Sequence, residues 1–249
     1  MRQILRAERG KTRRCGTSWI ALALGLLILA TAVRTVGNRT EELATGYSAM
    51  FYAMPIYNTI FLPVGLAVIA SRIWDIESKE KNCTLLFTLQ SRKSLLAAKG
   101  YLATRDNLIL VLVEGMGVLA AGRLVGYTEY MDIRQLLWML LCTALVNEML
   151  LMAALWLSIH FENPVGVLAT GIFASFSGTF TMFVSQTLNY FLPWSYYIRL
   201  VGMEMNWNEV TRKASYCAQD FQFWLLGLVI VFTLLLFRGA RRELEKKEV

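Results

Sequence analysis

The sequence predicts an all-α protein that crosses a membrane six times. Hydrophobic residues make up 56% of the 249 residues and charged residues only 17%, and the mean hydropathy is +0.46. A soluble domain of this length carries about 25% charged residues. The apolar residues are also gathered into long runs, which is typical of transmembrane helices. We therefore expect a single transmembrane domain over residues 1–249.

Residues 1–16 precede the first apolar run and are strongly basic. They read MRQILRAERGKTRRCG, with Ile4, Leu5 and Ala7 among the arginine and lysine residues. This pattern predicts a cytoplasmic elbow helix at the membrane surface, with its basic side chains facing anionic headgroups. A disordered basic tail is the alternative.

Six apolar segments are long enough, or nearly so, for the roughly 20 helical residues that cross a bilayer. They are residues 19–33, 53–70, 108–125, 136–159, 165–184 and 223–237. The first segment also fits a cleavable signal peptide, because a basic start precedes it and Ala30-Thr31-Ala32 ends it. We favour a retained helix, since five more apolar segments follow.

The distribution of lysine and arginine predicts the orientation. Eighteen of the 25 lie in residues 1–16, 71–106 and 238–249. These segments fall on one side of a six-span protein, and basic residues concentrate on the cytoplasmic side. Both termini are therefore expected in the cytoplasm. The net charge of +7 follows from this arrangement and does not indicate nucleic-acid binding.

The cytoplasmic segment between spans two and three, residues 71–106, is the candidate docking site for a soluble partner. Its centre reads IESKEKNCTLLFTLQSRKSLLAAK from Ile76 to Lys99, with charges at both ends and an amphipathic middle. A segment of this kind is too short to span and suits a membrane surface or another protein.

The outer connection, residues 185–221, carries the aromatic run YFLPWSYYIR from Tyr190 to Arg199. This run predicts a re-entrant or interfacial helix between spans five and six, with simple anchoring at the headgroups as the alternative. The charged residues 238–249 are expected to form a solvated cytoplasmic tail.

Two carboxylic acids, Glu114 and Glu148, lie inside predicted spans, and Asn147 adjoins the second. An ionised carboxylate at mid-depth costs several kcal/mol, so both are expected to face the bundle interior or to be neutral. They line a substrate path or hold helices together by hydrogen bonds. The sequence leaves both interpretations open.

Span five carries small residues in two pairs four residues apart. The pairs are Gly171 with Ser175 and Ala174 with Gly178. Such stripes allow close helix approach, within the bundle or between two copies.

Catalytic and metal-binding motifs are not found in the sequence. His160 is the only histidine, no His-Glu-x-x-His or Gly-x-Ser-x-Gly pattern occurs, and the four cysteines are widely spaced. Gly10-Lys11-Thr12 resembles the end of a phosphate-binding loop, but Leu5 stands where its first glycine is required. We expect no catalytic residue, metal or cofactor in this chain.

Two stretches resemble type-2 ABC exporter permeases, as does the order of the six spans and their connections. The first is ERGKTRR, residues 8–14, at the entry to span one. The second follows the family pattern of an acidic residue, Gly-Thr, Leu-Leu-x-x-Pro-x-Ser-Arg and a later lysine. The matching residues are Glu80, Cys83, Thr84, Leu85, Leu86, Leu89, Ser91, Arg92 and Lys99, with Cys83 replacing glycine and Leu89 replacing proline.

The resemblance implies a permease of the bacterial cell membrane, most similar to those of lantibiotic-immunity and bacitracin-type exporters. It implies two cytoplasmic ATPase subunits that bind ATP and Mg²⁺, a second permease, identical or related, and an amphipathic antimicrobial peptide as cargo. Contact with the ATPase is then expected from Glu77, Glu80, Thr84, Leu86, Ser91 and Arg92. A lipid or small drug as cargo, a transporter without an ATPase, and a membrane scaffold are the alternatives.

Overall fold

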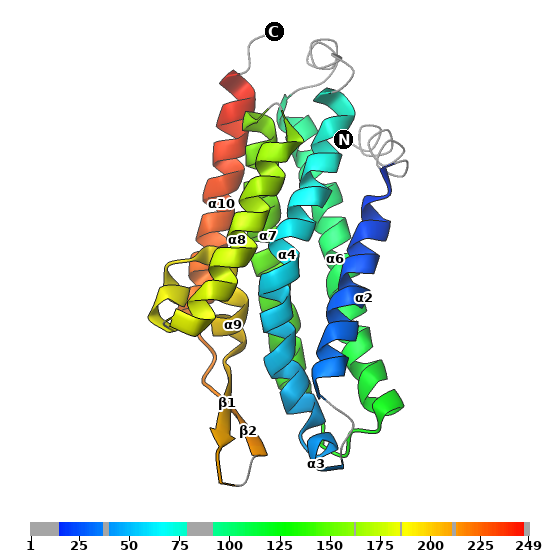
Figure 1. Cartoon of the computed structure of the whole chain (residues 1–249). Helices are drawn as coiled ribbons and strands as arrows, with labels where there is room; N and C mark the ends of the chain where they lie inside the picture. The colour runs from blue at the N-terminus through cyan, green and yellow to red at the C-terminus, as the bar shows by residue number, and fades with distance from the viewer. Residues whose placement is uncertain are drawn as a thin grey trace.

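The computed structural model describes residues 15–36, 40–78, 92–161, 163–184, 186–210 and 213–246. Six long helices run side by side along one axis (Figure 1). They are α2 (Thr17–Val36), α4 (Gly46–Ser78), α6 (Arg92–Val125), α7 (Ile133–His160), α8 (Pro164–Val184) and α10 (Phe223–Lys246). All six are long and apolar enough to cross a membrane, which confirms the predicted all-α polytopic fold.

Helix α4 is the centre of the bundle. It packs against α2, α7 and α8, and 61% of its most apolar stretch is buried inside the protein, compared with 17% for α10. Met50, Met54, Leu62, Leu66 and Ile73 of α4 are all at most 1% exposed. Helix α10 packs mainly on α7, at the edge of the bundle.

Local sequence signals explain several helix ends. The carboxylate of Asp132 accepts hydrogen bonds from the backbone N–H groups of Arg134 and Gln135, which caps the start of α7. Gly126 follows the end of α6 with a φ of 84°, in the left-handed region where a side chain is strained. Pro164 opens α8, where its missing N–H costs no helical hydrogen bond.

Three helices extend beyond the predicted apolar spans. Helix α4 begins at Gly46 and ends at Ser78, and α6 begins at Arg92. The described parts of the segment predicted between these spans, residues 71–78 and 92–106, are therefore helical. Helix α10 likewise continues to Lys246. An apolar run marks only the part of a helix that lies in hydrocarbon, whereas backbone hydrogen bonds continue into water.

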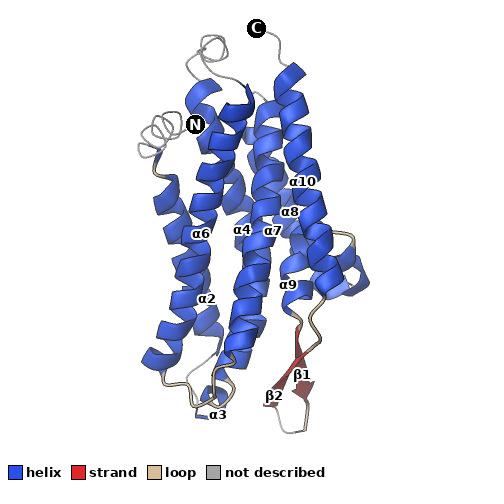
Figure 2. Ribbon diagram, turned by 180° about the vertical axis from the view of Figure 1, so that it is seen from behind, coloured by secondary structure: helices blue, strands red, loops and turns tan. Residues whose placement is uncertain are grey.

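The connection between α8 and α10 contains three short helices and a hairpin. They are η1 (Gln186–Tyr190), η2 (Pro193–Ser195), α9 (Tyr196–Val201), β1 (Met203–Asn208) and β2 (Lys213–Ala218). Helix α9 corresponds to the predicted re-entrant or interfacial helix and packs on α4 and α7. The antiparallel hairpin was not predicted, and it stands at the opposite end of the bundle from the start of α2 and the end of α10 (Figure 2).

Candidate functional site

The ends of α4 and α6 frame the predicted docking site. Glu77 lies in the last turn of α4, and Arg92 is the first residue of α6. Glu80, Thr84, Leu86 and Ser91 fall in residues 79–91, outside the described part of the chain, as do residues 1–14 of the predicted elbow. The described structure therefore gives the base from which the docking segment extends.

Lys99 joins α6 to α4 at this base. Its side chain is fully buried, and its ammonium donates a hydrogen bond of 2.7 Å to the backbone carbonyl of Ile73. The same ammonium lies 5.5 Å from the centre of the Trp74 ring, within range of a cation–π interaction. A buried lysine is costly unless its charge is satisfied, so this residue fixes the two helix ends relative to each other.

A small apolar cluster surrounds Trp74 and is separate from the main core. Its other members are Leu96, Ile159, Ala240 and Leu244, which come from α6, α7 and α10. Four of the six long helices therefore meet near the end of α4 and the start of α6, which flank the predicted docking segment. Because Ala240 and Leu244 are 1% exposed, the last part of α10 is packed against the bundle, whereas the sequence predicted a solvated tail.

A charged network fastens α2 to α6 one layer deeper. The hydroxyl of Ser18 donates to the Asp106 carboxylate at 2.8 Å, and Arg105 donates to both residues. Asp106 is fully buried, so this ion pair and hydrogen bond offset the cost of burying its charge.

A chain of buried and partly buried side-chain hydrogen bonds continues across the bundle from α6 to α9. Thr104 donates to Glu148 at 2.7 Å, and the Asn107 amide donates to the same carboxyl group at 3.3 Å. The Asn147 amide donates to Asn107 at 2.9 Å, and the Tyr197 hydroxyl donates to Asn147 at 2.5 Å. The polar network therefore links α6, α7 and α9.

Glu114 occupies a second polar position between α4, α6 and α7. It is fully buried, and the Asn58 amide donates to its carboxyl group at 3.1 Å and to the backbone carbonyl of Met54 at 3.3 Å. Glu114 and Glu148 thus both bond to side chains of neighbouring helices. These contacts favour helix packing over a substrate path for the two carboxyl groups.

Helix α9 is held from the α7 side by two further hydrogen bonds. The indole of Trp138 donates to the Leu200 carbonyl at 2.6 Å, and the Gln135 amide donates to the Val201 carbonyl at 2.9 Å. Both acceptors lie in the last turn of α9, where carbonyl groups have no partner within the helix. The hairpin begins two residues later, so α7 positions its base.

The small residues of α8 face α4. Gly171, Ala174, Ser175 and Gly178 are all buried. A Cβ atom on Gly171 would lie 2.9 Å from the backbone oxygen of Pro63, so the two helices are in close contact there. This stripe packs within one copy of the chain.

Sequence reasoning did not single out Asn58, Asn107 or Tyr197. Asn58 is a buried amide within an apolar span, and that was the available signal, since such residues are rare in membranes and bond to neighbouring helices. Asn107 stands one position before a predicted span, and Tyr197 is one of several tyrosines in an aromatic run. Neither position carries a comparable signal.

Among the described residues, no group of three or more histidine, cysteine, aspartate and glutamate side chains is placed to hold a metal ion. His160 of α7 pairs with Glu243 of α10 at 2.9 Å.

Residues 4–180 match the family model described as ABC-2 family transporter protein. Neither a curated protein nor a solved structure matches the chain.

Proposed function

The chain belongs to the ABC-2 family of transporter proteins, and we propose that it is the permease subunit of an ATP-driven exporter that expels an amphipathic antimicrobial peptide. Two cytoplasmic ATPase subunits bind ATP and Mg²⁺ and dock on residues 77–92. A second permease, identical or related, completes the complex. Its location is the bacterial cell membrane, with both termini in the cytoplasm.

The joining of α4 to α6 by Lys99 is the observation that carries this proposal. Residues 79–91 connect two helix ends that are held together by a buried ammonium and by the Trp74 cluster. A force applied to this connection therefore moves α4 and α6 together. Packed helices of this kind respond by shifting between discrete arrangements.

The buried polar network supplies a route for that movement to the other side of the membrane. Helix α6 carries Thr104 and Asn107, which bond to Glu148 and Asn147 of α7, and α7 in turn bonds to α9. Displacement of α6 at its cytoplasmic end is thus passed to the outer segment.

The cargo proposal rests on the resemblance to peptide exporters and on the character of the helix surfaces. Glu114 and Glu148 are committed to contacts between helices, so the membrane surface of the chain offers few fixed charges. One face of α8 presents exposed aromatic rings at helical spacing, which suits an amphipathic peptide drawn from the bilayer. These residues are Phe173, Phe176, Phe180 and Phe183.

Affinity purification of the full-length chain from its own membranes tests the ATPase partnership. We expect a nucleotide-binding subunit to accompany the wild-type chain. Arg92→Glu should reduce the recovery of that subunit, because it reverses the charge of a predicted contact residue. Glu80→Lys should act in the same direction. Arg123→Glu is the matched control, since Arg123 is an exposed residue at the far end of the same helix.

Absence of a nucleotide-binding subunit from the wild-type complex would contradict the exporter. Equal recovery with wild type, Arg92→Glu and Glu80→Lys would contradict the docking assignment alone. The cargo is tested separately, by growth of producing cells on antimicrobial peptides, lipid-active compounds and small drugs. If the chain protects cells against a lipid-active compound or a drug but not against peptides, the cargo is a lipid or a small drug and not a peptide.

A further inference from the structure

A cavity of about 210 Å³ lies at the hairpin end of the bundle, where α4, α8, η1, α9 and β1 meet. Neither the polar network nor the Trp74 cluster includes it. A water molecule takes about 30 Å³ in the liquid, so the cavity has room for a group several times that size. Its charged and apolar lining residues include Met182, Ile198, Arg199, Met203, Glu204 and Met205.

Arg199 brings a guanidinium with an unused donor to this cavity. The guanidinium carbon lies 4.6 Å from the centre of the Tyr190 ring, so the ring covers one face of the group. Hydrogen bonds leave a guanidinium in its plane, from five N–H donors. The Nε atom is buried, and no acceptor among the described residues bonds to it. A buried donor without an acceptor costs about 1–3 kcal/mol, which a bound anionic group offsets.

Glu204 brings the opposite charge to the same cavity. It is half-buried in β1, and within the described part of the chain no side chain forms a hydrogen bond or an ion pair with its carboxylate. Arg199 and Glu204 therefore line one cavity without pairing with each other. Two such charges complement a ligand that carries both a negative and a positive group.

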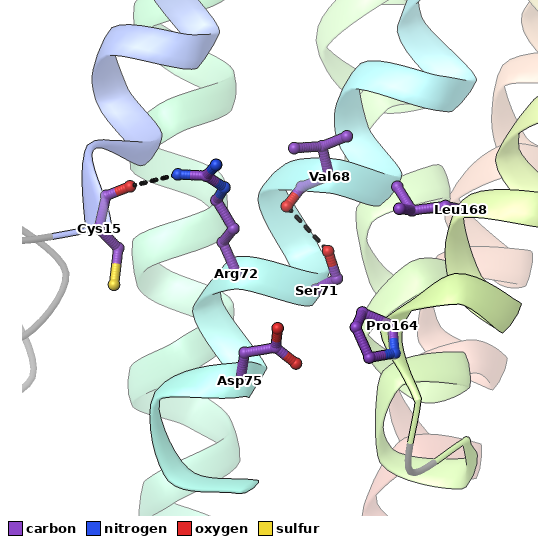
Figure 3. Close-up of a pocket in the computed structure, with 7 residues that line it drawn as sticks. All are labelled: Cys15, Val68, Ser71, Arg72, Asp75, Pro164 and Leu168. Atoms are coloured by element: carbon purple, nitrogen blue, oxygen red, sulfur yellow. Dashed lines mark hydrogen bonds between the residues drawn. The ribbon is translucent and has the colours of Figure 1, made fainter. Parts of the chain in front are cut away.

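The larger cavity at the opposite end of the bundle differs in this respect (Figure 3). There the Arg72 guanidinium donates a hydrogen bond of 3.2 Å to the backbone carbonyl of Cys15, and Asp75 also has an interaction within the chain. Its charged groups already have partners. In the hairpin cavity, the described surroundings leave the charges of Arg199 and Glu204 for a ligand.

Methionine side chains form much of the apolar wall of the hairpin cavity. Met203 is buried and Met205 is exposed on β1, and Met182 lies in the last turn of α8. Methionine is unbranched and polarisable, so it adapts to apolar groups of different shapes. Met182 is also next in sequence to Phe183, the last exposed ring on the aromatic face of α8. A peptide that lies on this face reaches the cavity with one end.

We propose that this cavity binds the C-terminal end of the exported peptide, an assignment that rests on the proposed function. Arg199 binds the terminal carboxylate, Glu204 pairs with the ammonium of a lysine near that terminus, and the last apolar side chain lies against Met182 and Met203. A peptide that ends in a carboxamide, or that lacks the lysine, therefore binds more weakly. The site selects cargo at the end of the bundle that is the proposed outer side.

Saturation-transfer NMR with the purified full-length chain in lipid nanodiscs tests the proposal. The first two probes are the soluble peptide acetyl-Ala-Lys-Leu with a free carboxylate and the same peptide as a carboxamide, which differ by one charge. We expect the acid to bind about tenfold more tightly, the size expected for a charge-assisted hydrogen bond. Replacement of the lysine by uncharged norleucine, the third probe, should also weaken binding of the acid.

Two variants separate the roles of the charges. Arg199→Gln should remove the difference between the acid and the carboxamide, and Glu204→Gln should remove the difference between the lysine and norleucine peptides. Each variant loses one preference and keeps the other, which a general disturbance of the hairpin would not produce. Arg123→Gln is the control, because Arg123 is an exposed residue outside the cavity.

Equal binding of the acid and the carboxamide to the wild-type chain would overturn the proposal. Failure of all three peptides to bind, or an unchanged preference in Arg199→Gln, would overturn it as well. If no peptide binds but native mass spectrometry shows phosphatidylethanolamine on the wild-type chain and not on Arg199→Gln, the ligand is a lipid headgroup.

The binding measurement uses no ATPase, so it can fail separately from the exporter proposal. Selective peptide binding without a co-purifying nucleotide-binding subunit would contradict the exporter and leave the peptide site. A co-purifying nucleotide-binding subunit without selective peptide binding would contradict the peptide site alone.

Discussion

Lys99 shows how one buried charge can join two helices. Its ammonium bonds to a carbonyl of α4 and approaches the Trp74 ring, while its backbone belongs to α6. The sequence alone marked this lysine as part of a family pattern, without indicating its contact. That contact depends on how α4 and α6 pair in space, which local sequence does not specify.

Lys99→Met should loosen the ends of α4 and α6. Loss of a hydrogen bond from a charged donor, about 1.5–3 kcal/mol, corresponds to roughly ten- to hundredfold faster local opening. Amide hydrogen exchange in residues 74–78 and 92–98 measures this opening. Lys93→Met is the control, because Lys93 is exposed on the same helix. Unchanged exchange in Lys99→Met would contradict the role of Lys99.

Tyr197→Phe should destabilise the protein, because it removes the hydrogen bond to a buried amide oxygen of Asn147. An unsatisfied buried acceptor costs about 1–3 kcal/mol. Denaturant titration in detergent measures the change in the free energy of unfolding. Tyr101→Phe, at a site that is 58% exposed, should change it little. If both variants unfold alike, the network does not hold α9.

The polar network shows which site residues the sequence could reveal. Glu114, Glu148 and Asn147 stand out because they are polar within apolar spans. Thr104 and Asn107, which bond to Glu148 and Asn147, lie before the predicted start of span three. The charges of Arg105 and Asp106 end the apolar run there, although these two side chains pair with each other in the bundle.

At the level of elements, the close packing of α8 on α4 depends on glycine. Gly171→Ala should destabilise the fold by about 1–3 kcal/mol, as overpacking does, because the new Cβ meets a backbone oxygen that cannot rotate away. Gly178→Ala should cost less, because its Cβ would meet side chains of Thr59 and Trp194. Thermal unfolding measures both.

Gly227→Ala is the matched control, since a Cβ there would meet no atom within 4 Å. Destabilisation of the same size in Gly227→Ala and Gly171→Ala would show a general effect of substitution in these helices. The close contact of α8 with α4 would then not be the cause.

The number and order of the long helices follow from the apolar runs, and the hairpin does not. Strand β1 reads MEMNWN, whose alternation of apolar and polar residues was an available strand signal. Strand β2 reads KASYCA with a weaker alternation, and most residues of both strands are exposed. The hairpin is fixed at its base instead, where the ring of Tyr216 lies 5.8 Å from that of Tyr52 of α4 and the Gln219 N–H donates to Gly202. These contacts join residues that are far apart in the sequence, so local sequence does not indicate them.

At the scale of the whole molecule, the two ends of the bundle carry different cysteines. Cys217 is exposed on the hairpin, Cys142 is buried in α7, and Cys15 lies at the opposite end, before α2. With both termini in the cytoplasm, a membrane-impermeant maleimide added to intact cells should label Cys217. Cys217→Ser should abolish the labelling, and opening the cells should make Cys15 reactive.

Labelling of Cys15 but not Cys217 in intact cells would reverse the proposed orientation. It would also place residues 79–91 outside the cell, away from any ATP. The labelling experiment therefore tests both the proposed topology and the exporter proposal.

The Trp74 cluster has a consequence for biosynthesis. Trp74 and Leu96 belong to helices α4 and α6, whereas Ala240 and Leu244 belong to α10, which is made after the other five long helices. The cluster therefore cannot close until α10 has been made. A nascent or truncated chain that lacks α10 leaves the indole of Trp74 uncovered at that end of the bundle, as a target for the chaperones and proteases that survey unfinished chains.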